Sequence, residues 1–294
     1  MAETRSKNGS GRKTNIFMIL LFIYLVIVAF AFTWPYFKPA EIGGDLSLPT
    51  AAEKAPSLAH PFGLDDLGRD VMANVLSGFR TSFVSGLMAT IPFLLVGLLF
   101  GIITGFEESA LAGLVGGLTN GLNSIPKFFA LFLIFAVMGK YLPFYLMIGL
   151  GLLSAPRLAE VLKFKISHYR KEDFYDAGIA LGLSPSAVVG KHIIWYNTRK
   201  SIFSELAYMF GYAVLSEATL SFILHGSMGR DWQSWGDIIS QELSSFSGLV
   251  YTLFNPSMGG FAQNNPLKFL VPLVALIFTV MIFSMLSRKL SEEY

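Results

Sequence analysis

The chain of 294 residues contains no cysteine, which excludes disulfides, thiolate metal sites and cysteine nucleophiles. Its four histidines are scattered without the spacing of metal ligands, so we expect no metal site. Charge is also scarce, because charged residues make up 14% of the chain and the formal net charge is only +2. Such a small net charge does not point to nucleic acid or to another polyanionic partner.

Motifs of the common catalytic sites are missing as well. The phosphate-binding motif G-x-x-x-x-G-K-[ST] has one near match, Gly190-Lys191, which is followed by His192 and has Pro185 at the first glycine. No nucleophile elbow, zinc-protease motif or paired-carboxylate pattern occurs in the sequence. We therefore predict that the chain is not an enzyme, carries no cofactor and does not itself hydrolyse ATP.

Apolar residues, in contrast, dominate the chain. Hydrophobic residues make up 53% of it and the mean hydropathy is +0.56, a composition typical of membrane proteins. A helix that crosses a bilayer needs about 20 apolar residues. We predict an all-α membrane protein with six transmembrane helices, at about 16–34, 81–106, 110–138, 141–158, 202–224 and 267–287.

The first window is also compatible with a cleavable signal peptide, because basic residues precede it. We interpret it as a retained anchor, since its apolar core is long and lacks a small-residue cleavage site. The fourth window is the weakest, and we expect Arg157 at its end to extend toward the membrane interface.

Lysine and arginine are unevenly distributed between the predicted loops. If the N-terminus is cytoplasmic, fourteen of them lie on that side and seven on the other. Because positive residues favour the cytoplasmic side, we predict that both termini are cytoplasmic. The predicted parts are a tail at 1–15, a first transmembrane helix at 16–36, an extracytoplasmic loop at 37–79, a core domain at 80–287 and a tail at 288–294.

The large cytoplasmic connection, at about 159–200, contains the polar stretch DFYDAGIALGLSPSAVVGKHIIW. Asp173 and Asp176 bring negative charge near a helix start, where it is favourable. Residues with helical spacing then form an apolar stripe: Phe174, Ala177, Gly178 and Leu181. The first part of the stretch therefore predicts a short amphipathic helix.

A turn and a second helix follow in the same stretch. Gly182 suits the left-handed residue that ends a helix, Ser184 suits an N-cap, and Pro185 suits the first helical position. Together the two parts predict a helical hairpin outside the membrane. Such a hairpin is either a passive connection or a docking surface for a soluble partner.

Residues 172–194, EDFYDAGIALGLSPSAVVGKHII, resemble the EAA loop of permeases from ATP-binding-cassette (ABC) importers. The acidic-Ala-Ala core of that loop corresponds to residues 176–178, and its spaced glycine corresponds to Gly182. Ile194 and Trp195 replace the usual Leu-Pro, which makes the path of the second helix a point of difference from the family.

Two further stretches are similar to the C-type permease subunits of dipeptide and oligopeptide importers. HPFGLDDLGRDVMANVLSGFRTS, residues 60–82, resembles their His-Pro-x-Gly-Thr-Asp-x-x-Gly-Arg-Asp signature, with Leu64 in place of threonine. SEATLSFI and WQSWGDII, residues 216–223 and 232–239, resemble their Glu-Ala-Ser-Leu-Ser-Phe and Trp-Gly segments. LHGSMG stands where those subunits usually have Gly-Leu-Gly.

The resemblance implies the type I permease fold of ABC importers, in a bacterial inner membrane, with half of a pathway for di- or oligopeptides. It also implies a sibling six-helix permease of the B type, two ABC ATPases that bind ATP and magnesium, and an extracytoplasmic substrate-binding protein. Relatives of this architecture carry nickel and other solutes too, so the cargo stays open. The residues implied in coupling to the ATPases are Asp173, Phe174, Asp176, Ala177, Gly178, Leu181, Gly182, Ser184 and Pro185.

Residues 65–79 have the pattern of an amphipathic elbow helix that lies on the outer membrane surface before the second span. Its apolar face would consist of Leu67, Val71, Val75, Leu76 and Phe79, with Asp65 and Asp66 at its start. The outer loop at about 225–266 is rich in Gly, Ser, Asn and Trp, and is either a lid or a contact for the binding protein.

Glycine recurs at every fourth residue in the second and third windows, at Gly97, Gly101 and Gly105 and at Gly113, Gly117 and Gly121. This spacing lets helix backbones approach closely in lipid. We expect packing inside the bundle, and pairing with the sibling permease is the alternative.

Ionisable residues at membrane depth are costly, so each should face protein or a water-filled path. Three fall within the predicted spans: Lys127, Glu205 and Glu217. Glu217 lies in a stretch shared with the family, so we expect a structural hydrogen-bond or ion-pair role at least as much as substrate contact. For Lys127 we hypothesise that its ammonium attracts a carboxylate or other anionic group of the substrate. The candidate pathway residues are Lys127, Asn120, Asn123 and Glu217.

Two other functions are considered beside the importer permease. An ion-gradient-driven secondary transporter or channel would need inverted repeats, facing broken helices or acidic relays, and no convincing internal repeat is seen. A scaffold subunit without a pathway of its own is the second. Import that survives ATP depletion but fails when the ion gradient collapses would favour the transporter.

Overall fold

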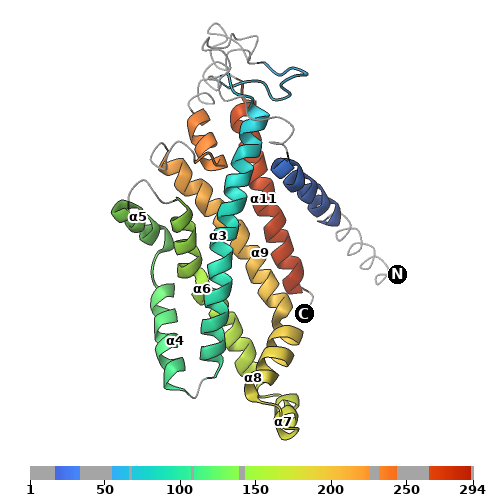
Figure 1. Ribbon diagram of the computed structural model, residues 1–294, viewed down its shortest axis with the longest axis vertical. Coiled ribbons are helices and arrows are strands. Elements are labelled where there is room, and N and C mark those ends of the chain that lie inside the picture. Colours follow the sequence, from blue (N-terminus) through green and yellow to red (C-terminus); the bar gives the residue numbers. More distant parts are fainter. Residues whose placement is uncertain are drawn as a thin grey trace, which may run out of the picture. The chain divides into compact units, whose positions relative to one another are not determined.

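The computed structural model describes residues 17–33, 55–65, 68–106, 109–138, 143–225, 232–243 and 265–292. Within these ranges the regular elements are helices, accompanied by one isolated bridge between Leu64 and Asp70 (Figure 1). The helices are Phe17–Thr33, α3 (Val71–Gly105), α4 (Ala110–Asn123), α5 (Lys127–Met138), α6 (Pro143–Tyr169), α7 (Asp173–Ala180), α8 (Pro185–Ala187), η2 (Val188–Thr198), α9 (Arg199–Ile223), 235–243 and α11 (Leu267–Glu292).

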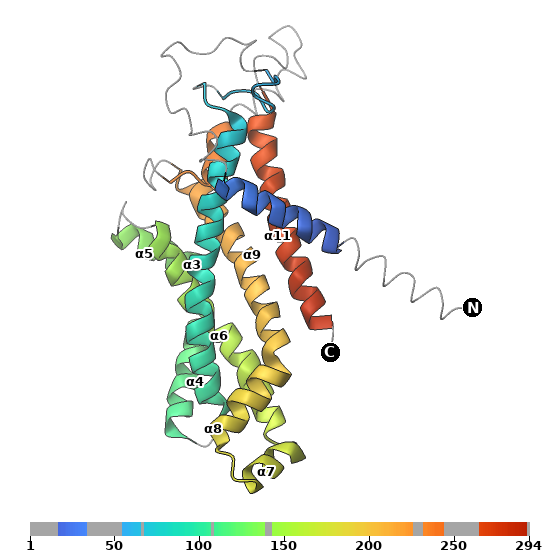
Figure 2. The same cartoon turned by 45° about the vertical axis from the view of Figure 1, so that its right-hand side comes forward.

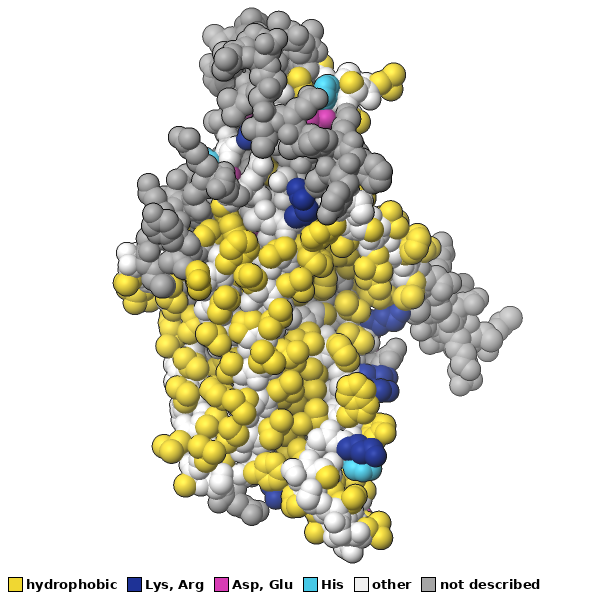
Figure 3. All heavy atoms as spheres, viewed as in Figure 1, with side chains coloured by type: hydrophobic (Ala, Val, Ile, Leu, Met, Phe, Trp, Pro, Cys, Tyr) yellow, Lys and Arg dark blue, Asp and Glu magenta, His cyan; other side chains and the backbone are white. Residues whose placement is uncertain are grey.

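Apolar helices long enough to cross a membrane confirm a multi-pass, all-helical protein. Four satisfy this test among the described residues, namely α3, α6, the continuous stretch Pro185–Ile223 and α11, and the bent pair of α4 and α5 adds a fifth if it counts as one span. Phe17–Thr33 is apolar but shorter. On the face shown in Figure 3, hydrophobic side chains cover most of the helical surface. Single long helices therefore account for only part of the six predicted transmembrane spans.

The window predicted at 110–138 contains two helices and not a single one. α4 ends at Asn123 and α5 begins at Lys127, and the two helices are bent by 85°. Pro126 explains the break, because proline has no backbone N–H to donate and disfavours helical backbone at the preceding Ile125. The expectation of a single helix here is wrong.

The helices belong to two compact units, which we describe separately. Unit 1 comprises residues 1–84 and 214–285, and unit 2 comprises residues 85–213 and 286–294. Helices α3, α9 and α11 each contribute to both units.

In unit 2, glycines on α3 permit close packing against α6. A Cβ atom added to any of them would lie less than 3.0 Å from an α6 side chain: Gly97 meets Leu158, Gly101 meets Leu162 and Gly105 meets Ile166. Real Cβ atoms do not approach so closely, so a larger residue would push the helices apart. The expected packing role of this first glycine series is confirmed.

The second glycine series, on α4, behaves differently. A Cβ atom added to Gly113, Gly117 or Gly121 would meet no atom of the described structure within 4 Å outside its own helix backbone. α4 packs on α6 and buries Ala112 and Thr119 on another part of its surface. The expectation that these glycines pack inside the chain is therefore wrong.

In unit 1, an aromatic core joins helices that are distant in sequence. The Tyr24 ring lies 6.1 Å from Phe79 and 5.7 Å from Phe283 between centroids, and Phe79 lies 5.3 Å from Trp235. A Cβ atom on Gly78 would lie 3.0 Å from the Trp235 side chain. Trp235 therefore holds helix 235–243 tightly against the start of α3.

The predicted elbow helix at 65–79 is not a separate element. Residues 71–79 are the first turns of the 35-residue α3, and Asp65 precedes them in a turn where it accepts hydrogen bonds from the backbone and side chain of Arg69. Gly68 has a φ of +76°, which ends any helical pattern at this point. Val71 and Phe79 are buried in the core of unit 1, and residues 66–67 lie outside the described ranges.

Candidate functional site

A helical hairpin follows α6, as Figures 1 and 2 show. α7 contains Asp173 and Asp176 in its first turn, as predicted. Arg170 anchors the base of the hairpin, because its guanidinium donates to the carbonyl oxygen of Gly105 across 3.3 Å and lies over the Tyr175 ring at 5.6 Å. Tyr175 is buried. The hairpin is therefore fastened to the end of α3 as well as to α6.

The turn of the hairpin has the geometry that the sequence predicts. Gly182 adopts a φ of +88°, and its N–H donates to the carbonyl of Ile179 across 2.9 Å. Leu183 N–H donates to the carbonyl of Gly178 across 3.1 Å, which completes a Schellman motif at the end of α7. The left-handed conformation favours glycine because it lacks a Cβ atom.

The second helix of the hairpin is capped as expected. Ser184 Oγ accepts a hydrogen bond from the backbone N–H of Ala187 across 3.2 Å, and Pro185 occupies the first turn of α8. Both predictions are confirmed. The cap and the Schellman motif together fix the turn on both sides, so the hairpin tip is a defined surface.

Apolar side chains are exposed at this tip. Leu181 is 84% exposed, Phe174 is 38% exposed and Ala177 is also exposed. The buried face of the hairpin instead uses Tyr175 and Val188. An exposed apolar tip on a fixed turn is suited to docking in a partner's groove, and motion of that partner would reach α6 and α9 through the anchored base.

A long π-helix, η2, connects the hairpin to α9. It spans 11 residues and forms a continuous helical stretch with α8 and α9. The side chain of Asn197 donates to the carbonyl of His192 across 2.8 Å. π-helical segments are rare in proteins, and those that occur often lie at functional sites. The sequence did not predict this geometry, although Ile194 and Trp195 marked the place as a departure from the family pattern.

Three of the four candidate pathway residues lie around the break between α4 and α5 in unit 2. Asn123 donates a hydrogen bond to Glu160 on α6, Asn120 is exposed one turn earlier, and Lys127 is the half-buried first residue of α5. Polar groups thus gather at the break between α4 and α5. Glu217, the fourth, belongs to unit 1.

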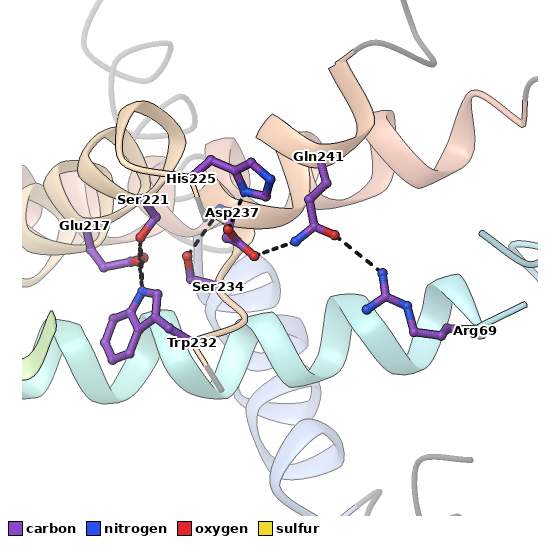
Figure 4. A network of polar contacts seen from close by, with 8 residues as sticks. All are labelled: Arg69, Glu217, Ser221, His225, Trp232, Ser234, Asp237 and Gln241. Carbon is purple, nitrogen blue, oxygen red and sulfur yellow. Dashed lines mark hydrogen bonds and ion pairs between the residues drawn. The ribbon is translucent and has the colours of Figure 1, made fainter. Parts of the chain in front are cut away.

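Glu217 lies in a buried network of hydrogen bonds (Figure 4). It is only 1% exposed and accepts bonds from Ser82 at 2.9 Å, Ser221 at 2.5 Å and Trp232 Nε1 at 3.3 Å. These donors come from α3, α9 and the segment before helix 235–243. The arrangement satisfies the carboxyl group within the protein and joins three elements of unit 1.

A second group of polar contacts, also shown in Figure 4, connects helix 235–243 of the predicted outer loop with His225 and Arg69. His225 Nδ1 lies 2.7 Å from Asp237, and Gln241 donates to Asp237 across 2.6 Å. Arg69 donates to Gln241 across 3.4 Å. Residues 226–231 and 244–264 of the predicted loop lie outside the described ranges, so its role as a lid or binding-protein contact stays a prediction.

Unit 2 also contains an ion pair that the sequence analysis missed. Arg157 Nε on α6 donates to Glu205 on α9 across 2.6 Å, and the guanidinium lies 3.9 Å from the centroid of the Tyr208 ring. Arg157 therefore does not simply extend to the interface. The available signal was that both charges fall in apolar stretches and each needs a partner there.

Comparison with known proteins gives consistent results. Residues 97–291 match the family described as binding-protein-dependent transport system inner membrane component. The chain is 27% identical to the oligopeptide transport system permease protein OppC of Bacillus subtilis, over 84% of this chain and 79% of that protein. It is 26% identical to the dipeptide transport system permease protein DppC of Alkalihalophilus pseudofirmus, over 71% and 67%. It is 22% identical to the glutathione transport system permease protein GsiD of Pectobacterium atrosepticum, over 81% and 77%.

Proposed function

The chain belongs to the family of binding-protein-dependent transport system inner membrane components, and from this premise we propose that it forms half of the pathway of an ATP-driven peptide importer. The printed names of the relatives include oligopeptide, dipeptide and glutathione transport, which supports di- or oligopeptides as the cargo class. The other half of the pathway is then a sibling six-helix permease.

One observation carries this proposal, namely the anchored hairpin with its exposed apolar tip. In our proposal two ABC ATPases bind ATP and magnesium and seat this tip in their grooves. Leu181 and Phe174 supply the exposed apolar contact, and the left-handed Gly182 shapes the turn. ATP-driven closure of the ATPases pushes the hairpin, and the helices switch between outward-open and inward-open states.

The proposed topology follows from the hairpin. If ATPases seat on residues 173–187, this side is cytoplasmic, and the uneven distribution of Lys and Arg then supports cytoplasmic termini. An extracytoplasmic binding protein would deliver the peptide to the opposite side. We place the complex in a bacterial inner membrane.

Along the pathway we propose roles for the polar residues of the α4–α5 break. Lys127 attracts an anionic group of the passing peptide, and Asn120 and Asn123 keep the break hydrated. We assign Glu217 a structural role and not substrate contact. Its carboxyl group already accepts hydrogen bonds from Ser82, Ser221 and Trp232.

Purification of the chain from its native membrane in mild detergent, followed by mass spectrometry, tests the proposal. We expect a second permease and ABC ATPases to accompany the chain. Recovery of the chain alone, in a preparation that preserves known complexes, would contradict it. Uptake that survives ATP depletion but stops when the ion gradient is collapsed would support the gradient-driven alternative instead.

A further inference from the structure

Arg157 is a half-exposed cation near the middle of the 27-residue helix α6, at the end of its apolar first half. It lies fourteen residues after Pro143 and twelve before Tyr169 on α6, or roughly 20 Å from either end at 1.5 Å per residue. Its side chain is 49% exposed. Phe164, two turns nearer the hairpin, is 70% exposed and lies between Lys163 and Lys165. The second half of α6 carries Glu160, Lys163 and Lys165, so Arg157 lies where the apolar first half of the helix ends, and its open side faces protein or water.

The guanidinium of Arg157 is only partly used by its neighbours. Nε donates to one oxygen of Glu205 across 2.6 Å and Nη2 approaches the other at 3.4 Å, so Glu205 occupies one edge of the group. A guanidinium has five N–H donors in a planar fork. The opposite edge, formed by Nη1 and Nη2, has no acceptor among the residues that the structure describes, and it matches the two oxygens of a carboxylate.

An aromatic ring lies against the face of this guanidinium. The Tyr208 ring lies 3.9 Å below the guanidinium carbon, and Tyr212 stacks on Tyr208 with centroids 6.1 Å apart. A ring in this position fixes the plane of the guanidinium by cation–π attraction. It also offers a partly exposed apolar surface next to the free donors.

A second polar pair lies one turn along α6. Glu160 accepts a hydrogen bond from Asn123 of α4, and residues three apart on a helix are surface neighbours. α6 therefore makes polar contacts with α4 through Glu160 and with α9 through Arg157. A lipid-facing surface would not carry two such pairs, so this face of α6 borders water or a polar partner.

We propose that the free edge of the Arg157 guanidinium, supported by the Tyr208 ring, binds a carboxylate of the transported peptide. This inference rests on the proposed function and names one contact within its pathway. Glu205 holds Arg157 in place and partly neutralises it, which keeps the attraction weak enough for the peptide to leave again.

The other surface that could face Arg157 is the sibling permease. The passing substrate is favoured because Arg157 and Glu205 already neutralise each other. A permanent second carboxylate from a protein partner would place two acidic groups on one cation, whereas a transient one is accommodated by the donors that Glu205 leaves unused.

The test uses the complete importer, with its binding protein, in liposomes and compares labelled trialanine with its C-terminal amide. The same binding protein delivers both, so its own preference cancels when a variant is compared with wild type. We expect Arg157→Gln to lower trialanine uptake about tenfold, the effect of losing a charge-assisted hydrogen bond. Uptake of the amide should change less than twofold. An equal loss for both peptides, or no loss for either, would overturn the inference.

A charge-swapped variant separates binding from folding. Arg157→Glu combined with Glu205→Arg keeps an ion pair between α6 and α9 but moves the cation to α9. We expect the complex to assemble normally and the preference for trialanine over its amide to stay lost. Restored preference in the swap, or release of the sibling permease from Arg157→Gln, would assign a structural role to the pair and overturn the inference. If wild type imports no di- or oligopeptide with ATP, the proposed peptide cargo itself is wrong.

Discussion

Ser82 on α3 donates a hydrogen bond to the buried carboxyl group of Glu217 on α9 across 2.9 Å, although 135 residues separate them. Trp235 makes a similar long-range contact, since its indole N–H donates to the carbonyl of Val75 across 3.0 Å. These contacts bring together in unit 1 residues 60–82, 216–223 and 232–239, whose sequences resemble C-type peptide permeases. The residues that these stretches share with the family therefore include residues of the packed core of unit 1.

The role of Glu217 gives the first prediction. Glu217→Ala should lower the stability of the purified chain by roughly 1–3 kcal/mol, because Ser82 and Ser221 lose their buried acceptor. Glu217→Gln should cost less, since the amide retains one acceptor and the Ser82 hydroxyl can turn to accept from its NH₂ group. Thermal unfolding in detergent measures the stability of both variants. Glu292→Ala, a substitution at an exposed residue, is the control. Unchanged stability of Glu217→Ala combined with lost uptake would return Glu217 to the pathway.

The two glycine series predict opposite effects of one substitution. Gly101→Ala should destabilise the chain, because the new Cβ would lie 2.6 Å from Leu162. Gly117→Ala should be neutral or stabilising by up to about 1 kcal/mol, since its Cβ meets open space and alanine is the better helix former.

Thermal unfolding of the isolated chain measures this matched pair. Equal destabilisation by both substitutions would contradict the packing described here. If Gly117→Ala leaves the isolated chain intact but weakens its recovery with a second permease, the α4 glycines instead pair with that sibling.

Local signals predicted the hairpin well, because its structure depends on neighbours in sequence. Gly182, Ser184 and Pro185 each have the backbone role expected from their residue type. The prediction of a separate elbow helix was wrong because of contacts with residues distant in the sequence. An apolar stripe that suggested a membrane surface is instead buried against an aromatic core, and Trp235 comes from a segment more than 150 residues away.

Partners across helices could not be predicted in the same way. The sequence indicated that Arg157 and Glu205 were unusual, but helical periodicity does not say which helices adjoin, so their pairing needed the structure. Likewise, the spacing of glycines is the same in α3 and α4, and only the position of α6 distinguishes the packed series from the open one.

Lys127 provides a test of the pathway proposal. Lys127→Met should reduce uptake of peptides with an anionic end and spare neutral solutes, because the ammonium at the helix break would no longer attract a carboxylate. Uptake by the reconstituted importer measures the effect, at equal protein levels. Lys163→Met, at an exposed lysine on α6, is the control for loss of a positive charge. Unchanged uptake by Lys127→Met would remove Lys127 from the pathway.

The hairpin turn provides the most direct test of coupling. A Cβ atom on Gly182 meets nothing within 4 Å, so a large side chain there would project from the tip and would not disturb the packing of unit 2. Gly182→Trp should therefore abolish ATP-driven uptake while membrane insertion and recovery with the sibling permease stay normal. The positive φ adds strain for any side chain, and a control must separate this strain from bulk.

Gly182→Asn is that control, because asparagine tolerates the left-handed conformation and adds only a small side chain. It should retain a substantial part of the uptake and still recover the ATPases on purification, whereas Gly182→Trp should lose them. If both variants lose the ATPases equally, backbone strain explains the loss and the tip need not be the docking surface. Normal uptake by Gly182→Trp would show that no partner seats on the turn, since a bulky indole cannot be accommodated in a groove that closes around glycine.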